Sequence, residues 1–291
     1  MKSAVALSLK LSIPKVVIGM TVVSFATSAP ELIVSITAAL EGSPDLALGN
    51  VVGSNIANLG LVLGVTVVLG SIDVRKSFYT TDWPVMMMAS ILFVGFIYYD
   101  GVLEKYEGII MVLFLVLFLV YLLRFQKTKV VDELPEDDKP LPLYKTISLL
   151  AMGGVALWGG SELLIQGAKN LASALGVSER VIGITVVSVG TSIPELAASI
   201  IAILKKEKAN SVGNLIGSNI FNVLAVLGIT SIITPVRVID QGLLTSDVFW
   251  MLGISFVILP LVFLPKKLRL GWRDGLILIG LYSTFVYFTV K

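Results

Sequence analysis

The chain has 291 residues, of which 56% are hydrophobic and only 14% charged, and its net charge is +2. A soluble domain of this length would have about a quarter of its residues charged, so the composition predicts a membrane protein, and the small net charge predicts no nucleic-acid partner. Because the chain has no Cys and no His, disulfides, thiol chemistry, His proton relays and Ser-His catalysis are excluded, and only oxygen ligands remain for a metal ion.

Apolar runs of about twenty residues, the length that crosses ~30 Å of hydrocarbon, recur along the whole chain. They predict an all-α polytopic membrane protein in a lipid bilayer. The nine predicted spans cover residues 15–40, 45–70, 82–99, 105–123, 143–166, 180–204, 210–233, 244–264 and 272–290.

The distribution of basic residues between the predicted loops indicates the orientation of the chain. When the spans alternate, 17 of the 22 Lys and Arg fall on one side and five on the other. Cytoplasmic loops carry the excess of Lys and Arg. We therefore expect a multi-pass cell-membrane protein whose linker 124–142 is cytoplasmic and whose C-terminus is outside. The linker is polar, acidic in its second half and punctuated by Pro, which is typical of a solvated tether.

An internal repeat emerges when 164 is added to each residue number. Residues 17–66 and 181–230 then align without a gap, with 27 identical pairs in 50. Apolar positions differ between the copies, as in Phe25 against Val189, whereas most buried polar positions are kept. The kept pairs include Thr27/Thr191, Ser28/Ser192, Glu31/Glu195, Asn50/Asn214, Ser54/Ser218, Asn55/Asn219 and Asn58/Asn222. This selective retention favours a functional role for the polar residues.

Five spans separate equivalent positions, so the second copy should enter the membrane from the opposite side. The sequence thus predicts two inverted-topology repeats, an arrangement that places transporter substrate sites near the midplane. We expect a first repeat over 1–123, the linker, and a second repeat over 143–291. By the same offset, residues 1–14 correspond to 165–178 and are interpreted as the tail of a helix whose body, equivalent to about 143–164, is absent, so the first repeat is expected to lack its first span.

Each copy places a Pro and a Glu in the middle of an apolar span, as TSAPEL (27–32) and TSIPEL (191–196). Pro30 and Pro194 should break their helices, which membranes tolerate only where the backbone is buried in protein or lines a cavity. Thr27 and Glu31 are four residues apart and share one helix face. In the next span Asn50, Ser54 and Asn58 form a stripe at the same spacing.

These groups are all hard oxygen ligands, in a number that suits Ca²⁺ better than Mg²⁺. Two carboxylates balance the charge of one Ca²⁺ or two Na⁺, and leaving them ionised without a cation is costly at membrane depth. A site that must always be compensated, and that accepts either ion, is a physical basis for exchange. Glu162 is a third carboxylate, for which a packing role and a role in ion entry remain open.

The two segments VVIGMTVVSFATSAPELIVS…ALGNVVGSNIANLGLVLG and VVIGITVVSVGTSIPELAAS…SVGNLIGSNIFNVLAVLG resemble the two α-repeats of the sodium/calcium exchanger family, in the cation/calcium antiporter superfamily. The resemblance covers essentially the whole chain, although the family has ten spans and nine are visible here. It implies cation ligands at Thr27, Ser28, Glu31, Ser54, Asn58, Thr191, Ser192, Glu195, Ser218 and Asn222, and backbone carbonyl ligands at Ser24 and Ser188.

The resemblance also implies that two helices slide across the core to switch access, one equivalent to 143–166 and one to the missing first span. This chain departs from the family at two positions. Family members that exchange sodium often carry Asp where this chain has Asn222, so a three-for-one stoichiometry is not expected. Ala26 replaces a Gly that Gly190 keeps in the second copy, a change that should be tolerated.

The leading hypothesis is therefore an antiporter that exchanges Ca²⁺ for Na⁺ through Glu31 and Glu195, with no cofactor beyond the transported ions. A Ca²⁺/H⁺ antiporter using the same glutamates is the alternative, and a cation channel on the same repeats is a third. An enzyme is not expected, because intramembrane aspartyl proteolysis needs a pair of membrane-buried Asp and the Asp residues here lie at span ends or in loops. The sequence leaves K⁺ dependence and oligomeric state open.

Overall fold

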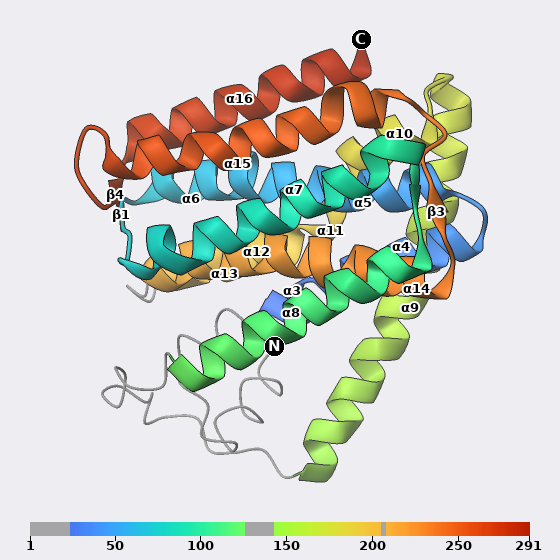
Figure 1. Cartoon of the computed structure of the whole chain (residues 1–291), viewed down its shortest axis with the longest axis horizontal. Coiled ribbons are helices and arrows are strands. Elements are labelled where there is room, and N and C mark those ends of the chain that lie inside the picture. Colours follow the sequence, from blue (N-terminus) through green and yellow to red (C-terminus); the bar gives the residue numbers. More distant parts are fainter. Residues whose placement is uncertain (1–23, 126–142, 205–207) are drawn as a thin grey trace.

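The computed structural model describes residues 24–125, 143–204 and 208–291, which form a bundle of helices with two short ribbons (Figure 1). The expected remnant of a first helix at 1–14 and most of the linker 124–142 lie outside the described residues.

The first half contains α3 (Ser24–Thr27), α4 (Ala29–Leu40), α5 (Pro44–Ala57), η2 (Asn58–Val62), α6 (Leu63–Leu69), β1 (Ile72–Asp73), η3 (Phe78–Asp82), α7 (Trp83–Asp100), β2 (Val102–Leu103) and α8 (Lys105–Phe125). The second half contains α9 (Leu143–Leu175), α10 (Glu179–Ile182), η4 (Gly183–Val187), α11 (Ser188–Thr191), α12 (Ile193–Leu204), α13 (Lys208–Phe221), η5 (Asn222–Leu227), α14 (Gly228–Ile233), β3 (Val236–Arg237), η6 (Leu243–Asp247), α15 (Val248–Phe263), β4 (Arg269–Leu270) and α16 (Trp272–Val290).

The helical runs follow the predicted spans closely, and the prediction of a polytopic helical membrane protein is confirmed. Within the described parts of the chain, six runs are long and apolar enough to cross a membrane. They are Pro44–Leu69, Phe78–Asp100, Lys105–Leu122, Glu179–Ile203, Val212–Ile233 and Leu243–Phe263. The apolar helix Ala29–Leu40 is shorter than these six runs.

α9 continues beyond the predicted 143–166 span to Leu175, through the stretch that the repeat offset relates to residues 1–14. Gly167, directly after the predicted span, does not interrupt the helix, and no Gly or Pro follows it before Gly176. Gly176 ends it instead, with a positive φ of 65°, and the N–H of Val177 bonds back to the carbonyl of Ala172 at 3.1 Å. This is the left-handed helix end that glycine favours.

The two ribbons show that the halves are inverted. β1 pairs with β4 near one end of the bundle, and β2 pairs with β3 near the other (Figure 1). The offset of 164 maps β1 onto β3, while β2 and β4 each precede the last helix of their half. The symmetry that exchanges the halves therefore also exchanges the two ends of the molecule. This is the inverted-topology repeat that the sequence predicted.

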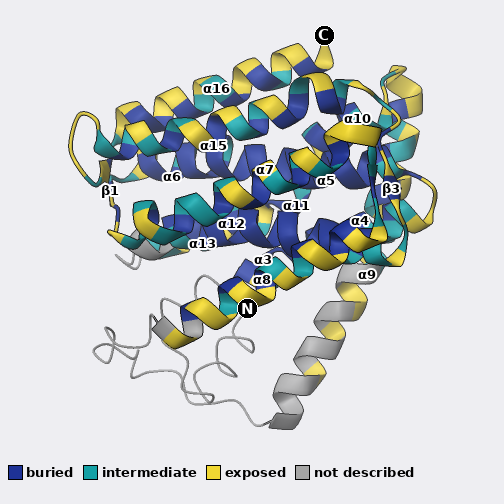
Figure 2. Cartoon of the chain, viewed as in Figure 1, coloured by how far each residue is buried: buried dark blue, intermediate teal, exposed yellow. Residues whose placement is uncertain are grey.

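Two helical runs form the centre of the bundle and the others surround them (Figure 2). In the most apolar 18-residue stretch of Pro44–Leu69 and of Val212–Ile233, 83% of the residues are buried, whereas the share is only 33–39% in Phe78–Asp100, Lys105–Leu122 and Leu243–Phe263. The outer helices expose large apolar side chains such as Ile91, Leu117 and Phe256. A hydrophobic outer surface suits contact with lipid, so the polar residues of the two central runs lie where lipid does not reach.

Glycines let the central run of the first half approach η4 and α11 very closely. A Cβ on Gly53 would lie 2.5 Å from the carbonyl oxygen of Ile184, and one on Gly49 would lie 3.0 Å from that of Arg180. Gly49 and Gly53 are four residues apart and form the small-residue edge that such close helix packing requires.

The loops near the β2–β3 ribbon are held together by ion pairs. Lys169 contacts Glu41 at 2.9 Å, and Arg180 contacts Asp240 at 2.9 Å and Asp247 at 2.5 Å. Burial alone would raise the pKa of Asp240, but hydrogen bonds from Ser178 and Arg180 outweigh it and hold that pKa below its ordinary value. The segments around Glu41, Lys169, Arg180 and Asp240 therefore lie together at this end of the molecule.

Candidate cation-binding site

Both repeats contain a helix that is interrupted beside the intramembrane Pro. α3 ends at Thr27 and α4 begins at Ala29, and α11 ends at Thr191 and α12 begins at Ile193. The residues at the breaks, Ser28 and Ser192, have nearly identical dihedral angles, with φ near −84° and ψ of 4° in the first and φ of −83° and ψ of 1° in the second. The expected Pro-induced break is thus present twice, and each break points its Ser and Glu into the protein.

The central runs are also irregular at matched positions. Each changes from α-helix to a wider π-helical stretch, beginning at Asn58 in η2 and at Asn222 in η5. Stretches of the same π-helical kind also occur at η3, η4 and η6, so the widening alone does not mark a functional site. Asn58 and Asn222 are therefore placed where the helix is locally widened.

All twelve residues proposed from the sequence are buried. They are Ser24, Thr27, Ser28, Glu31, Ser54, Asn58, Ser188, Thr191, Ser192, Glu195, Ser218 and Asn222, and none is more than 4% exposed. The burial of Glu31 and Glu195 is complete.

Hydroxyl groups join the two repeats in a symmetric pair of contacts. The hydroxyl of Thr27 lies 3.1 Å from that of Ser218, and the hydroxyl of Ser54 lies 3.2 Å from that of Thr191. Each contact brings a residue of a broken helix against the central run of the other repeat. The site is therefore formed jointly by both halves of the chain.

The two carboxylates have no hydrogen-bond partner among the residues that the structure describes. All four oxygens of Glu31 and Glu195 are buried and unpaired. Thr191 approaches Glu31, and Thr27 and Ser218 approach Glu195, without reaching hydrogen-bond geometry. The two carboxylates are also near enough to interact electrostatically. Two buried carboxylates without partners are costly, so this arrangement calls for a compensating cation or proton.

Four further oxygens in the described part of the site are also buried and unpaired. They are the hydroxyl oxygens of Ser28 and Ser192 and the amide oxygens of Asn58 and Asn222. With the carboxylates they make eight unpaired oxygens in four symmetry-related pairs. Buried polar atoms are nearly always hydrogen-bonded, so such a concentration indicates that something other than protein satisfies them.

The predicted carbonyl ligands are already in use within the protein. The carbonyl oxygen of Ser24 accepts from the Ser28 N–H and the Thr27 hydroxyl, at 2.9 and 3.2 Å. The carbonyl oxygen of Ser188 accepts from the Ser192 N–H and the Thr191 hydroxyl, at 3.0 and 3.2 Å. These carbonyls lie inside the site, and their hydrogen bonds hold the broken helices in shape.

Four Asn residues of the kept polar pairs support the site, although they are not among the twelve predicted ligands. The amide oxygen of Asn50 accepts from the Thr191 hydroxyl at 3.1 Å, and the Ser24 hydroxyl donates to the backbone carbonyl oxygen of Asn214 at 3.1 Å. Asn55 and Asn219 contact each other between the two central runs. Their identity in both repeats was the signal that could have revealed them.

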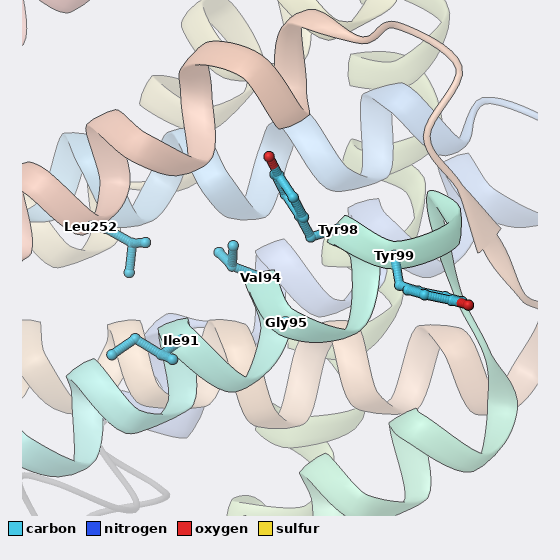
Figure 3. A pocket seen from close by; sticks show the side chains of 6 residues that line it. All are labelled: Ile91, Val94, Gly95, Tyr98, Tyr99 and Leu252. Atoms are coloured by element: carbon cyan, nitrogen blue, oxygen red, sulfur yellow. The ribbon is translucent and has the colours of Figure 1, made fainter.

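Two other features lie apart from these oxygens. Glu162 accepts a hydrogen bond from Gln166 at 3.1 Å along the exposed face of α9. An apolar groove of about 370 Å³ lies on α7 and α15 (Figure 3). It is lined by Ile91, Val94, Gly95, Tyr98, Tyr99 and Leu252. The groove offers no carboxylate or amide side chain to a cation. Within the described residues there is also no cluster of three or more acidic side chains, so any cation here depends on two carboxylates and neutral oxygens.

Inverted repeats of transmembrane helices, with broken helices and buried polar groups where the repeats meet, define a secondary transporter. Comparison with known proteins identifies the family. The model of the family described as "Sodium/calcium exchanger protein" matches residues 1–124 and 145–291, and the chain belongs to that family.

Relatives and solved structures agree with this assignment. The chain is 38% identical to the putative antiporter CaxA of Alkalimonas amylolytica, over 98% of this chain and 91% of the relative. It is 28% identical to the sodium/calcium exchanger MaX1 of Methanosarcina acetivorans, over 98% and 91% of the two chains. A structure of the sodium-calcium exchanger NCX_Mj soaked with Na⁺ and Ca²⁺ superposes with a TM-score of 0.70 at 26% identity, covering 98% of this chain and 90% of the other.

Proposed function

We propose that this membrane antiporter exchanges Ca²⁺ for Na⁺ through one site at which Glu31 and Glu195 act together. The observation that carries the proposal is the set of eight buried, unpaired oxygens that the two repeats contribute equally. Six to eight oxygen ligands are what Ca²⁺ prefers, and the chain has no His or Cys side chain to favour a transition metal. The names of MaX1 and NCX_Mj support sodium as the counter-ion.

Exchange follows from the electrostatics of the two glutamates. One Ca²⁺ or two Na⁺ would neutralise both carboxylates, whereas a site without cations would leave two like charges buried close together. The change between the conformation open to one side of the membrane and the conformation open to the other is therefore favourable only when a cation is bound. This condition couples the movement of one ion to the movement of the other in the opposite direction.

The identity of the counter-ion is tested by changing one gradient at a time. Proteoliposomes that contain the purified protein and internal Na⁺ are expected to take up ⁴⁵Ca²⁺ from Na⁺-free buffer, and uptake should stop when Na⁺ is equal on both sides. Vesicles loaded with choline at matched pH serve as the control. Uptake that follows a pH gradient and ignores Na⁺ would show a Ca²⁺/H⁺ antiporter. Flux that needs no counter-ion at all would show a channel.

The charge of the site also predicts the response to voltage. Asn58 and Asn222 are both neutral amides, so the site has only two negative charges to balance, and exchange of two Na⁺ for one Ca²⁺ moves no net charge. Uptake driven by Na⁺ is expected to change by less than about twofold when a K⁺ gradient with valinomycin imposes ~100 mV of either sign. A several-fold acceleration by one sign of potential would instead indicate a third Na⁺.

We further propose that the repeats extend over 1–123 and 143–291 and that the linker 124–142 is cytoplasmic, with the C-terminus outside. The excess of Lys and Arg on the linker side supports this orientation. Because the chain has no Cys, a single cysteine introduced in the linker or at the C-terminus can be tested for labelling by a membrane-impermeant reagent added outside intact cells. Labelling of Lys291→Cys but not of Lys129→Cys is the expected result.

A further inference from the structure

Asn55 and Asn219 occupy equivalent positions in the two repeats and touch each other where the central runs cross. Both are 1% exposed. The side-chain nitrogen of Asn55 donates to the backbone carbonyl oxygen of Asn219 at 3.3 Å, and that of Asn219 donates to the backbone carbonyl oxygen of Asn55 at 3.1 Å. Because the two residues are related by the repeat offset, the pseudo-twofold axis passes between them.

These reciprocal bonds fix which way each amide faces. A backbone carbonyl can only accept a hydrogen bond, so the atom of each side chain that contacts it must be the nitrogen. The amide oxygens of Asn55 and Asn219 must then point to the other side of their planar groups. The orientation of this pair follows from the main chain rather than from a choice between similar atoms.

The amide oxygens of the same pair accept hydrogen bonds from two residues of the site. Each of these bonds joins a residue of one repeat to a residue of the other. The oxygen of Asn219 accepts from the nitrogen of Asn58 at 3.0 Å, and the oxygen of Asn55 accepts from the nitrogen of Asn222 at 3.1 Å. With their nitrogens committed, Asn58 and Asn222 turn their oxygens away from the axis. Those are the oxygens left buried and unpaired.

We propose that Asn55 and Asn219 are positioning residues that set the amide oxygens of Asn222 and Asn58, respectively, toward the transported cation. The inference rests on the proposed function, because it gives Asn58 and Asn222 the role of cation ligands. Without its acceptor, a ligand amide can rotate by a half-turn and present N–H groups to the cation, which repel it. The pairing is crossed between the repeats, so each ligand amide depends on the other half of the chain.

A double-mutant cycle on Ca²⁺ affinity tests the crossed pairing. Asn219→Ala is expected to raise the Ca²⁺ concentration for half-maximal uptake about tenfold, because Asn58 loses its acceptor. Adding Asn58→Ala should then produce no further loss beyond that of Asn58→Ala alone, whereas adding Asn222→Ala should multiply the two effects. Thr66→Val removes a buried hydroxyl from the same central run away from the amides and is the matched control. It should leave the affinity within twofold of wild type.

The equivalent variants with the two repeats exchanged provide an independent test. Asn55→Ala should be non-additive with Asn222→Ala and multiplicative with Asn58→Ala. If the effects of the single variants on Ca²⁺ affinity multiply with both partners in either set, Asn55 and Asn219 have a merely structural role and the proposal is overturned. Failure of both Asn219→Ala and Asn55→Ala to yield folded protein, as judged by gel filtration in detergent, would also overturn it. A wild-type protein that takes up no Ca²⁺ would contradict the proposed function instead, so the two failures are distinguishable.

Discussion

Replacing either Glu31 or Glu195 with glutamine is expected to abolish Ca²⁺ uptake, with a loss of about a hundredfold or more from either change alone. Glutamine keeps the size of the side chain and one oxygen but removes the negative charge, and the affinity of a calcium site depends strongly on the charge of its ligands. Both carboxylates are completely buried and unpaired, so no nearby acid in the described structure can replace the missing charge.

The measurement is ⁴⁵Ca²⁺ uptake into Na⁺-loaded proteoliposomes at matched protein content. Glu107→Gln is the control, because Glu107 is also a nearly buried carboxylate in a membrane helix, but it caps the helix by accepting from the N–H of Glu104 at 2.8 Å. Glutamine can make the same bond, so uptake should stay within about twofold of wild type. Uptake that persists in the variant carrying both Glu31→Gln and Glu195→Gln would exclude this site as the transport pathway.

Replacing Gly53 with alanine is expected to produce the second-largest effect, through packing rather than charge. A Cβ there would lie 2.5 Å from the Ile184 carbonyl oxygen, 2.7 Å from the Ile184 Cα and 2.8 Å from the Ser188 Cβ. Two of these atoms are backbone and cannot rotate away, so α5 must move from η4 and α11. That movement separates Ser54 from Thr191 and opens the site, at a cost of about 1–3 kcal/mol from overpacking.

We expect Gly53→Ala to lower uptake by about tenfold and to lower the melting temperature in detergent. Gly49→Ala should be milder, since its nearest contact is 3.0 Å. Gly190→Ala is the control, because nothing lies within 4 Å of the added Cβ and the first repeat already has Ala26 at that position. Full activity of Gly53→Ala alongside full activity of Gly190→Ala would show that the close approach of the two runs is unnecessary.

Much of this architecture could be predicted because a bilayer restricts what a helix can do. Apolar runs gave the spans to within a few residues, and an odd number of spans between the copies predicted the inversion that the paired ribbons confirm. α9 ends at Leu175, beyond the apolar span, because the end of a helix is set by local stop signals rather than by hydropathy. Gly176 is such a signal, and it stands ten residues after the predicted end.

The site was predictable in its residues but not in its hydrogen bonding. Identity between the repeats identified Glu31, Glu195 and their polar neighbours, since these positions are kept while apolar positions such as Phe25 and Val189 differ. Pattern alone could not separate the amides that face a cation from the amides that hold them. Asn55 and Asn58 are the same residue type three positions apart, and only the bonds to the opposite repeat distinguish their roles.

Equilibrium binding of ⁴⁵Ca²⁺ to the purified protein tests most directly whether the two glutamates form one shared site. The wild-type chain is expected to bind one Ca²⁺, and Glu31→Gln and Glu195→Gln are each expected to bind none at concentrations that saturate the wild type. Two Ca²⁺ per wild-type chain, with one remaining in each variant, would mean that the carboxylates belong to separate sites and would contradict the account.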